Sequence, residues 1–311
     1  MRLEGIHHIT AITGDAPRNV DFYVRVLGLR MIKKSVNQDD PTVYHLFYAD
    51  ENASPGADLT FFEYPKARAG RAGAGMIHRI VHRVAGPDAL DFWQDRLGSE
   101  GVAATRVDSG LRFADPEGLE HELRVVDVPD APLTARSTEV PDEHALQGFH
   151  EVHAAVANPR KSRELLAGVL GFEDRGEDRF EARGDSRGGA IVFEPAAGRG
   201  FGGAGTIHHI AWASKMDEHE AWRSAVLEAG LQATPVIDRY YFRSVYFREP
   251  GGILYELATL GPGFTTDEPF ETLGERLALP ADFERLREQV EPLLTPLPDV
   301  RQWRPAVTPR G

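Results

Sequence analysis

The chain has 311 residues, a formal net charge of −13 at pH 7, 41% hydrophobic residues and 27% charged residues. This composition is that of a folded protein, and the acidic balance disfavours nucleic acid or an anionic membrane surface as a partner. Because the chain contains no cysteine, disulfide bonds, thiolate metal ligands and a cysteine nucleophile are excluded. No apolar stretch reaches the roughly 20 residues of a membrane span, and we recognise no signal peptide, so we expect a cytoplasmic protein.

The first predicted unit covers residues 3–65. A strand-like run from Gly5 to Thr13 contains the pair His7-His8, and a helical pattern follows it. Asp15 suits the N-cap of that helix, and Gly28 suits its end. The unit closes with a strand-like run whose last residue is Glu63.

Three later segments repeat this order of elements. Each has a strand, a helix and further strands, and two of them follow a glycine-rich stretch and close at a Glu-Leu pair. The predicted helices lie over residues 87–98, 158–171 and 216–230. The chain therefore predicts an α+β fold of four βαβββ units, at about 3–65, 76–126, 148–195 and 206–259.

This repetition suggests how the chain is divided. We expect an N-terminal pair of units over 1–127, a proline-rich linker over 128–147 and a C-terminal pair over 148–260. A tail over 261–311 should contain one amphipathic helix near 281–293. The run Gly200-Phe-Gly-Gly-Ala-Gly205 fits a dinucleotide-binding pattern, but a strand follows it where that motif needs a helix, so we interpret it as a linker.

Two histidine pairs occupy equivalent places, His7-His8 at the start of unit one and His208-His209 at the start of unit four. Side chains alternate along a strand, so only one histidine of each pair can face a given site. Glu256 lies in an otherwise apolar run, where a carboxylate is costly unless it is paired or bound to a metal. Structural histidines are the ordinary explanation for one such residue, but this combination predicts a divalent metal held by His8, His209 and Glu256. Two imidazoles and one carboxylate, with other positions open, favour iron(II) over structural zinc.

Units two and three differ at these positions. They carry Arg79, Glu151 and Glu122 where the other units have His209, His8 and Glu256. An arginine thus stands where one metal ligand would be. We therefore expect units two and three to form a metal-free copy of the site, in which Arg79 pairs with Glu122 and Glu151. The metal site then draws on both ends of the chain. We expect units one and four to pair, and units two and three to pair, as two curved-sheet barrels.

Other residues near the predicted triad follow from turn geometry. The tight turn Glu249-Pro-Gly-Gly252 places Tyr246 opposite Glu256 on the same face. Arg239 or Tyr246 can polarise a phenolic or oxygen-derived anion. Thr10 shares a face with His8, whereas alternation alone directs His7 and His208 away from the metal. For Tyr240, Tyr241 and Phe242 we favour core packing.

These features resemble the vicinal-oxygen-chelate superfamily of glyoxalases, bleomycin-resistance proteins and extradiol dioxygenases. More narrowly, the chain is similar to ring-cleaving dioxygenases that act on hydroquinones, over nearly its whole length. The segments that carry the resemblance are Leu3-Glu-Gly-Ile-His-His-Ile-Thr10, Tyr44-His-Leu-Phe-Tyr-Ala-Asp50 with Pro55-Gly56, Gln147-Gly-Phe-His150, Ile207-His-His209, Asp238-Arg-Tyr-Tyr-Phe-Arg-Ser-Val-Tyr246, Pro250-Gly-Gly252 and Gly263-Phe-Thr-Thr-Asp267.

The resemblance implies an extradiol-type ring-cleaving dioxygenase that takes a hydroquinone-like or catechol-like diol and O2. It implies iron(II), with manganese, zinc or nickel as alternatives, held by the same three residues. Supporting roles fall to His7, Thr10, His208, Arg239 and Tyr246. Of these, His208 or Tyr246 would act as acid or base, and Arg239 would stabilise the developing anion. A β-bulge would reconcile the places of His7 and His208 with strand alternation.

Three questions stay open at the level of sequence. The main alternative function is a glyoxalase-like isomerase or lyase in which Glu63 supplies a fourth ligand; a metal-free, drug-sequestering protein is a third class. The sequence does not decide between para- and ortho-diols or name the ring substituents. It also leaves the oligomeric state open, with a homo-oligomer as one outcome.

Overall fold

The computed structural model describes residues 1–305, which form two eight-stranded sheets. The strands of the first sheet are β1 (Ile6–Thr13), β2 (Arg30–Asn37), β3 (Asp40–Ala49), β4 (Asp58–Glu63), β13 (Thr206–Ser214), β14 (Ile237–Asp238), β15 (Phe242–Arg248) and β16 (Leu254–Pro262). Those of the second sheet are β5 (Met76–Val84), β6 (Ala104–Val107), β7 (Gly110–Ala114), β8 (Glu120–Val125), β9 (Phe149–Val156), β10 (Glu173–Asp174), β11 (Arg179–Arg183) and β12 (Gly188–Pro195).

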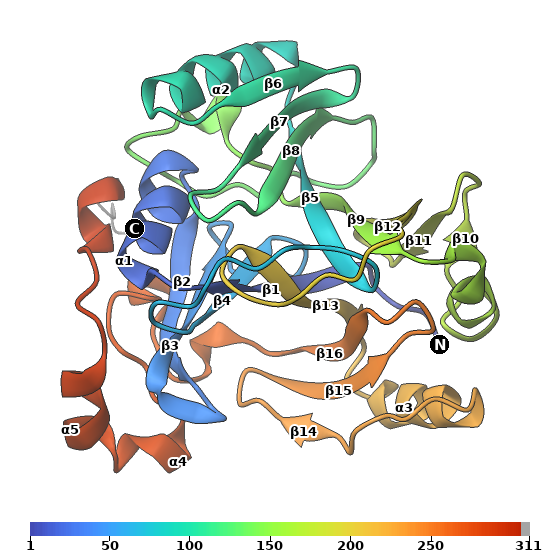
Figure 1. The fold of residues 1–311 in the computed structure, drawn as a ribbon. Helices are drawn as coiled ribbons and strands as arrows, with labels where there is room; N and C mark the ends of the chain where they lie inside the picture. Colours follow the sequence, from blue (N-terminus) through green and yellow to red (C-terminus); the bar gives the residue numbers. More distant parts are fainter. Residues whose placement is uncertain (306–311) are drawn as a thin grey trace.

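The strand orders confirm how the units pair. The first sheet runs β14-β15-β16-β13-β1-β4-β3-β2, so unit four joins unit one through antiparallel β13 and β1. The second runs β10-β11-β12-β9-β5-β8-β7-β6 and joins units three and two in the same way. Figure 1 shows the blue strands of unit one lying beside the gold and orange strands of unit four. Each half of the chain thus contributes to both sheets, and a domain boundary at 128–147 stays a prediction.

The helices differ in regularity between units. The expected helix after Asp15 is α1 (Ala16–Val20) followed by a π-helical turn (Asp21–Val26), and the Asp15 carboxylate accepts a hydrogen bond from the Arg18 amide at 3.2 Å. Units two and four contain the regular helices α2 (Pro87–Ser99) and α3 (His219–Glu228). In unit three the corresponding segment is a 3-10 turn (Pro159–Lys161) followed by a π-helical turn (Glu164–Val169). Further 3-10 turns elsewhere are Asp142–His144, Phe264–Thr266, Phe270–Thr272 and Val300–Trp303.

The single tail helix expected near 281–293 is wrong. The segment consists of α4 (Ala281–Glu284), α5 (Arg287–Val290) and a 3-10 turn (Glu291–Leu293). The break follows α4, where the Leu286 amide bonds to the Phe283 carbonyl three residues back rather than continuing the α-helical pattern. In Figure 1 this tail runs beside the outer strands of unit one.

Both histidine pairs lie at β-bulges. In the pairing of β1 with β13, the register shifts between Ile6 and His8, so His7 is the extra residue on β1. A second shift leaves His208 as the extra residue on β13, because Thr10 pairs with His209 and Ala11 with Ile207. A bulge re-aims the side chains beside it. The bulges proposed from the sequence are therefore present on both strands.

The glycine-rich stretches 67–75 and 197–205 connect the two sheets and pair with each other through isolated bridges. A Cβ on Gly73 would lie 2.4 Å from the Gly200 amide nitrogen, so close backbone approach requires glycine there. Large side chains, among them Trp93, Trp212 and Trp222, fill the core. Within residues 1–305, no helix is long and apolar enough to cross a membrane.

A buried lysine ties the tail to the first sheet. Lys33 on β2 is fully buried, and its Nζ donates to the Phe264 carbonyl at 3.1 Å, to Asp267 at 2.7 Å and to Glu268. Replacement Lys33→Met removes the cation and leaves two carboxylates unpaired, one of them buried. We expect the free energy of unfolding to fall by about 3–5 kcal/mol in chemical denaturation. The adjacent, partly exposed Lys34→Met is the control, and an equal loss in both variants would contradict this account.

Candidate metal centre

Three strands bring the predicted triad together. His8 comes from β1, His209 from β13 and Glu256 from β16, and all three side chains are buried. The Glu256 Oε2 atom lies 3.2 Å from His8 Nε2 and 2.9 Å from His209 Nε2. One nitrogen or oxygen atom from each residue thus lies within 4.8 Å of the others, close enough for all three to contact one ion. The structure assembles these residues from opposite ends of the chain, as predicted.

The chemistry of the triad fits a divalent metal. His209 Nε2 and Glu256 Oε2 are buried without a well-directed hydrogen bond within the described part of the chain. Burial raises the pKa of Glu256, but His8 and His209 lower it more, so the net pKa lies well below its usual value and the carboxyl is ionised. A buried carboxylate facing two imidazole nitrogens is costly without a cation. His8, His209 and Glu256 would hold a metal in the three-ligand arrangement that leaves other positions open.

The first histidine of each pair orients the second. His7 Nδ1 lies 2.9 Å from His8 Nδ1, and His208 Nδ1 lies 2.8 Å from His209 Nδ1. His7 Nε2 is 3.1 Å from the Thr259 carbonyl, which can only accept, so His7 carries its proton on Nε2. His8 then donates from Nδ1, so that in the neutral ring the Nε2 lone pair faces Glu256. Burial, then His8, lowers the pKa of His7 to about 3, consistent with this neutral tautomer.

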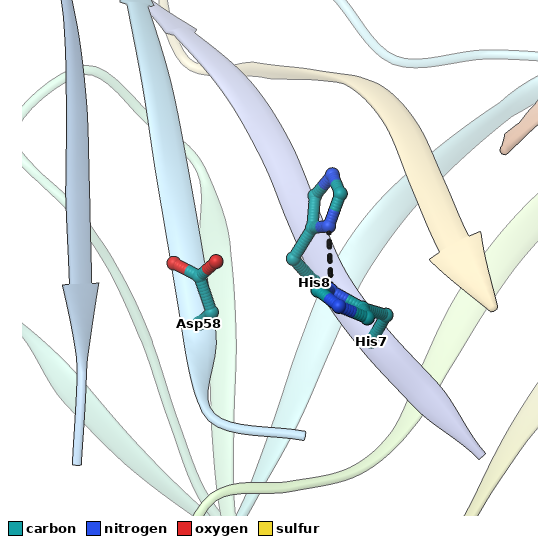
Figure 2. A group of neighbouring side chains, drawn as sticks. All are labelled: His7, His8 and Asp58. Carbon is teal, nitrogen blue, oxygen red and sulfur yellow. Dashed lines mark hydrogen bonds between the residues drawn. The ribbon is translucent and has the colours of Figure 1, made fainter. Parts of the chain in front are cut away.

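Asp58 is a buried carboxylate beside this pair that sequence reasoning missed. It begins β4 next to His8, and Figure 2 shows it across from the His7–His8 hydrogen bond. One oxygen lies within 4.8 Å of a ring nitrogen of each histidine, and neither oxygen has a hydrogen-bond partner in residues 1–305. Burial raises the pKa of Asp58 to about 7. A divalent ion held by two neutral imidazoles and one carboxylate keeps one positive charge, which Asp58 would balance.

A cavity opens on the triad. It is a small cavity with a volume of about 40 Å³, and it opens to solvent. His8, His209 and Thr10 form part of its lining, together with polar and aromatic side chains. The aromatic and basic members of this lining are His45, Phe47, Phe62, Arg239, Tyr241, Phe242 and Tyr246. Tyr241 and Phe242 pack in a buried hydrophobic cluster, as expected, and also form cavity wall.

The predicted partners Arg239 and Tyr246 both reach the cavity. Tyr246 pairs with Glu256 across β15 and β16, which confirms the register expected from the turn. Its ring centre is 5.7 Å from that of His209, and the Arg239 guanidinium carbon lies 5.5 Å from the same tyrosine ring. Burial, then Glu256, raises the pKa of Tyr246 above its usual value, so its hydroxyl stays protonated. Ser244, on the same face of β15, donates to Glu256 Oε1.

His208 lies outside this cavity. It lines a separate pocket together with His209 and Arg248. Its Nδ1 is engaged with His209, and burial, then His209, lowers its pKa to about 4. His208 is not among the residues that line the cavity, so its role as the acid or base of the reaction stays a prediction. The position supports a role in orienting His209.

Glu63 is not placed to be a fourth ligand. Thr60 and Phe62 of β4 face the triad side, so alternation turns Glu63 to the opposite face of the sheet. There its carboxylate accepts hydrogen bonds from the Tyr44 amide at 3.4 Å and the Thr295 hydroxyl at 3.1 Å. The alternative function, a glyoxalase-like isomerase or lyase with Glu63 as fourth ligand, therefore lacks that ligand.

The equivalent place in the second sheet is filled by arginines. Arg79 Nε lies 3.4 Å from Glu122, as expected, but its expected pairing with Glu151 is wrong. Arg124 bonds to both carboxylates instead, because it lies two residues beyond Glu122 on the same face of β8. Glu151 also accepts from Arg179 at 2.9 Å. Fixed cations thus neutralise the two buried carboxylates of this copy.

Strand register identifies further differences between the two sheets. Asp58 pairs with His8, and the matching partner of Glu151 is Ala190. Thr60 pairs with Thr10, and the matching position is Val192. The unpartnered carboxylate and the threonine hydroxyl therefore occur in the sheet that carries the triad. Composition and motif gave no signal for Asp58 or Thr60, whereas His45 and Ser244 were included only as members of the quoted segments around Tyr44 and before Tyr246.

Comparison with known proteins identifies the family of this chain. The profile of the Glyoxalase/Bleomycin resistance protein/Dioxygenase superfamily matches residues 5–123 and 148–257. The chain belongs to this superfamily.

Individual relatives match nearly the whole chain. It is 37% identical to "Putative ring-cleaving dioxygenase MhqA" of Bacillus subtilis (strain 168), covering 96% of this chain and 100% of that protein. It is 31% identical to "Chlorohydroquinone/hydroquinone 1,2-dioxygenase" of Sphingobium indicum, covering 93% and 95%. A solved "putative dioxygenase" from Bacillus subtilis superposes with a TM-score of 0.88 at 39% identity, covering 96% of this chain and 98% of that one.

Asp58 gives a direct test of the charge argument. Replacement Asp58→Asn removes the negative charge that would balance a bound cation. We expect the affinity for iron(II) or manganese(II) to fall about 10- to 100-fold, measured anaerobically by competition with a chromophoric chelator. Asp115→Asn, at a buried carboxylate in the turn between β7 and β8, should leave the affinity unchanged. Equal affinities in wild type and Asp58→Asn would contradict the proposed charge balance.

Proposed function

We propose that this protein is an iron(II)-dependent ring-cleaving dioxygenase that acts on a hydroquinone-like or catechol-like aromatic diol with O2. The observation that carries the proposal is the buried triad of His8, His209 and Glu256 at an aromatic-lined cavity. The names of the relatives support the same reaction class, and one of them is a hydroquinone 1,2-dioxygenase.

The bound metal would supply one specific part of the chemistry. When bound, iron(II) supplies open coordination positions and the electron transfer that lets dioxygen react with an aromatic diol. Manganese, zinc and nickel are the alternative occupants. Extradiol-type cleavage of a catechol is one form of the reaction, and cleavage of a para-diol, as named for the Sphingobium relative, is the other.

The residues around the cavity bind and polarise the diol. Phe47, Phe62 and Phe242 offer faces and edges for an aromatic ring and keep water from its surface. Arg239 places a positive charge beside Tyr246, where it stabilises a phenolate oxygen. The Tyr246 hydroxyl, held in its protonated form by burial, donates a hydrogen bond to that oxygen. We therefore assign the proton donor of the reaction to Tyr246 rather than His208.

The histidines outside the triad act through the ligands. His7 and His208 each hold the Nδ1 atom of the next histidine, so that its Nε2 faces Glu256. Outer partners of this kind are expected to tune ligand basicity and orientation. Thr10 lines the cavity floor and accepts a hydrogen bond from Thr60 at 2.9 Å.

Oxygen uptake tests the proposal. The protein is reconstituted anaerobically with iron(II), and uptake is then followed with methylhydroquinone and with catechol. We expect uptake with at least one diol and a ring-opened product that contains both oxygen atoms of O2. No uptake with either diol, in protein fully occupied by zinc or nickel, would overturn the oxidative function.

The two sheets supply a matched pair of variants. Glu256→Gln removes the carboxylate of the triad, whereas Glu122→Gln makes the same change at the equivalent buried position of the second sheet. We expect Glu256→Gln to lower both iron content and oxygen uptake by at least about 100-fold. Uptake per folded Glu122→Gln protein, with folding checked by circular dichroism, should stay within about 2-fold of wild type. Comparable losses in both would argue that the triad has no special role.

A further inference from the structure

A chain of three side chains leads from the floor of the cavity to a histidine that the proposed function does not yet use. His45 Nε2 lies 3.0 Å from Thr60 Oγ1, and the Thr60 hydroxyl donates to Thr10 Oγ1 at 2.9 Å. The three residues lie on neighbouring strands β3, β4 and β1. His45 and Thr10 line the cavity, and Thr60 links them.

This chain favours one tautomer of His45, the one with its proton on Nε2. Thr60 has one hydroxyl proton, and it is donated to Thr10. With its proton donated to Thr10, Thr60 accepts from His45, which corresponds to the neutral imidazole with its proton on Nε2. The lone pair then lies on Nδ1, which has no hydrogen-bond partner among residues 1–305. Burial, then the nearby His8 and His209, keeps the pKa of His45 well below its usual value, so the ring stays neutral.

Packing holds the His45 ring in place. Its centre lies 3.9 Å from the ring centre of Phe47 and 4.4 Å from that of Phe62. β4 separates β3 from β1, which puts the His45 backbone roughly 9.5 Å across the sheet from the strand of His8. A fixed hydrogen-bond acceptor thus lines the same cavity as the triad, but from a strand two positions away.

We propose that His45 Nδ1 accepts a hydrogen bond from the second hydroxyl of a para-diol whose first hydroxyl points at the triad. This assignment rests on the proposed function and narrows its substrate class. In an ortho-diol the two hydroxyls are adjacent, and both can face the triad. In a para-diol they lie at opposite ends of the ring, so the far hydroxyl needs its own partner. His45 is then a specificity-determining residue for hydroquinone-like substrates.

The residue at the position of Thr60 in the second sheet is consistent with this assignment. Val192 replaces Thr60 there, so the hydroxyl that anchors His45 is missing from the copy without the triad. Valine has nearly the shape of threonine and is already present at this place in the fold. Thr60→Val is therefore a mild way to release His45 Nε2.

Binding measurements test the proposal without turnover. Iron(II)-loaded protein is titrated anaerobically with hydroquinone, catechol and phenol by calorimetry. In His45→Phe, which keeps an aromatic ring between Phe47 and Phe62, we expect the Kd of hydroquinone to rise about 3- to 10-fold. The Kd values of catechol and phenol should stay within about 2-fold, because these ligands lack a far hydroxyl. Thr60→Val should shift hydroquinone in the same direction by a smaller factor.

The outcomes distinguish failure of the His45 assignment from failure of the proposed function. If hydroquinone and phenol lose affinity equally in His45→Phe, or if hydroquinone is unaffected, His45 does not recognise the second hydroxyl, while the dioxygenase proposal stands. If His45→Phe does not fold, Thr60→Val decides the question by the same ratio of hydroquinone to phenol affinity. If none of the three ligands binds the wild-type protein, the proposed function fails and the assignment of His45 fails with it.

Discussion

The antiparallel contact between β1 and β13 joins the two ends of the chain, and the metal centre depends on it. His8 and His209 stand on these two strands, and Glu256 follows on β16 beside β13. A shift of one residue along a strand turns every side chain to the other face, so this register decides whether the three residues meet. The bulges at His7 and His208 are part of the same contact, because each puts an extra imidazole where it can hold its neighbour.

The two sheets differ in how the charge of a buried carboxylate is balanced. Each buries a carboxylate at the same place, Glu256 in the first sheet and Glu122 in the second. In the second sheet Arg124 and its neighbours neutralise the carboxylates with fixed cations. In the first sheet, the residues beside Glu256 include the uncharged Ala211 and Ala258. Glu256 Oε2 faces two imidazole nitrogens there rather than an arginine. A mobile cation is the counter-charge that this arrangement can accept, with Asp58 balancing what remains.

Much of this organisation could be predicted from the sequence because duplication leaves a readable pattern. Repeated glycine-rich stretches and helices mark the four units, and the change from His209 to Arg79 marks which pair of units keeps the site. The turn before Ile253 was sufficient to place Tyr246 opposite Glu256. These inferences need only local chemistry and the comparison of equivalent positions.

What the sequence could not supply is the register between strands that are distant along the chain. Asp58 and His45 reach the site only through the pairing of β1, β4 and β3, which no local pattern encodes. Whether Glu63 coordinates was left open for the same reason, because the facing of β4 is set by its pairing with β1. Arg124 could have been identified by strand alternation, because it lies two residues beyond Glu122 on the same face of β8.

Anomalous diffraction at the iron edge, from crystals grown anaerobically with iron(II), tests the central claim most directly. The account predicts one strong peak bounded by His8 Nε2, His209 Nε2 and the Glu256 carboxylate, and no peak beside Glu122 and Glu151 in the second sheet. Absence of a peak at the triad in iron-loaded protein, or an equal peak in the second sheet, would contradict it.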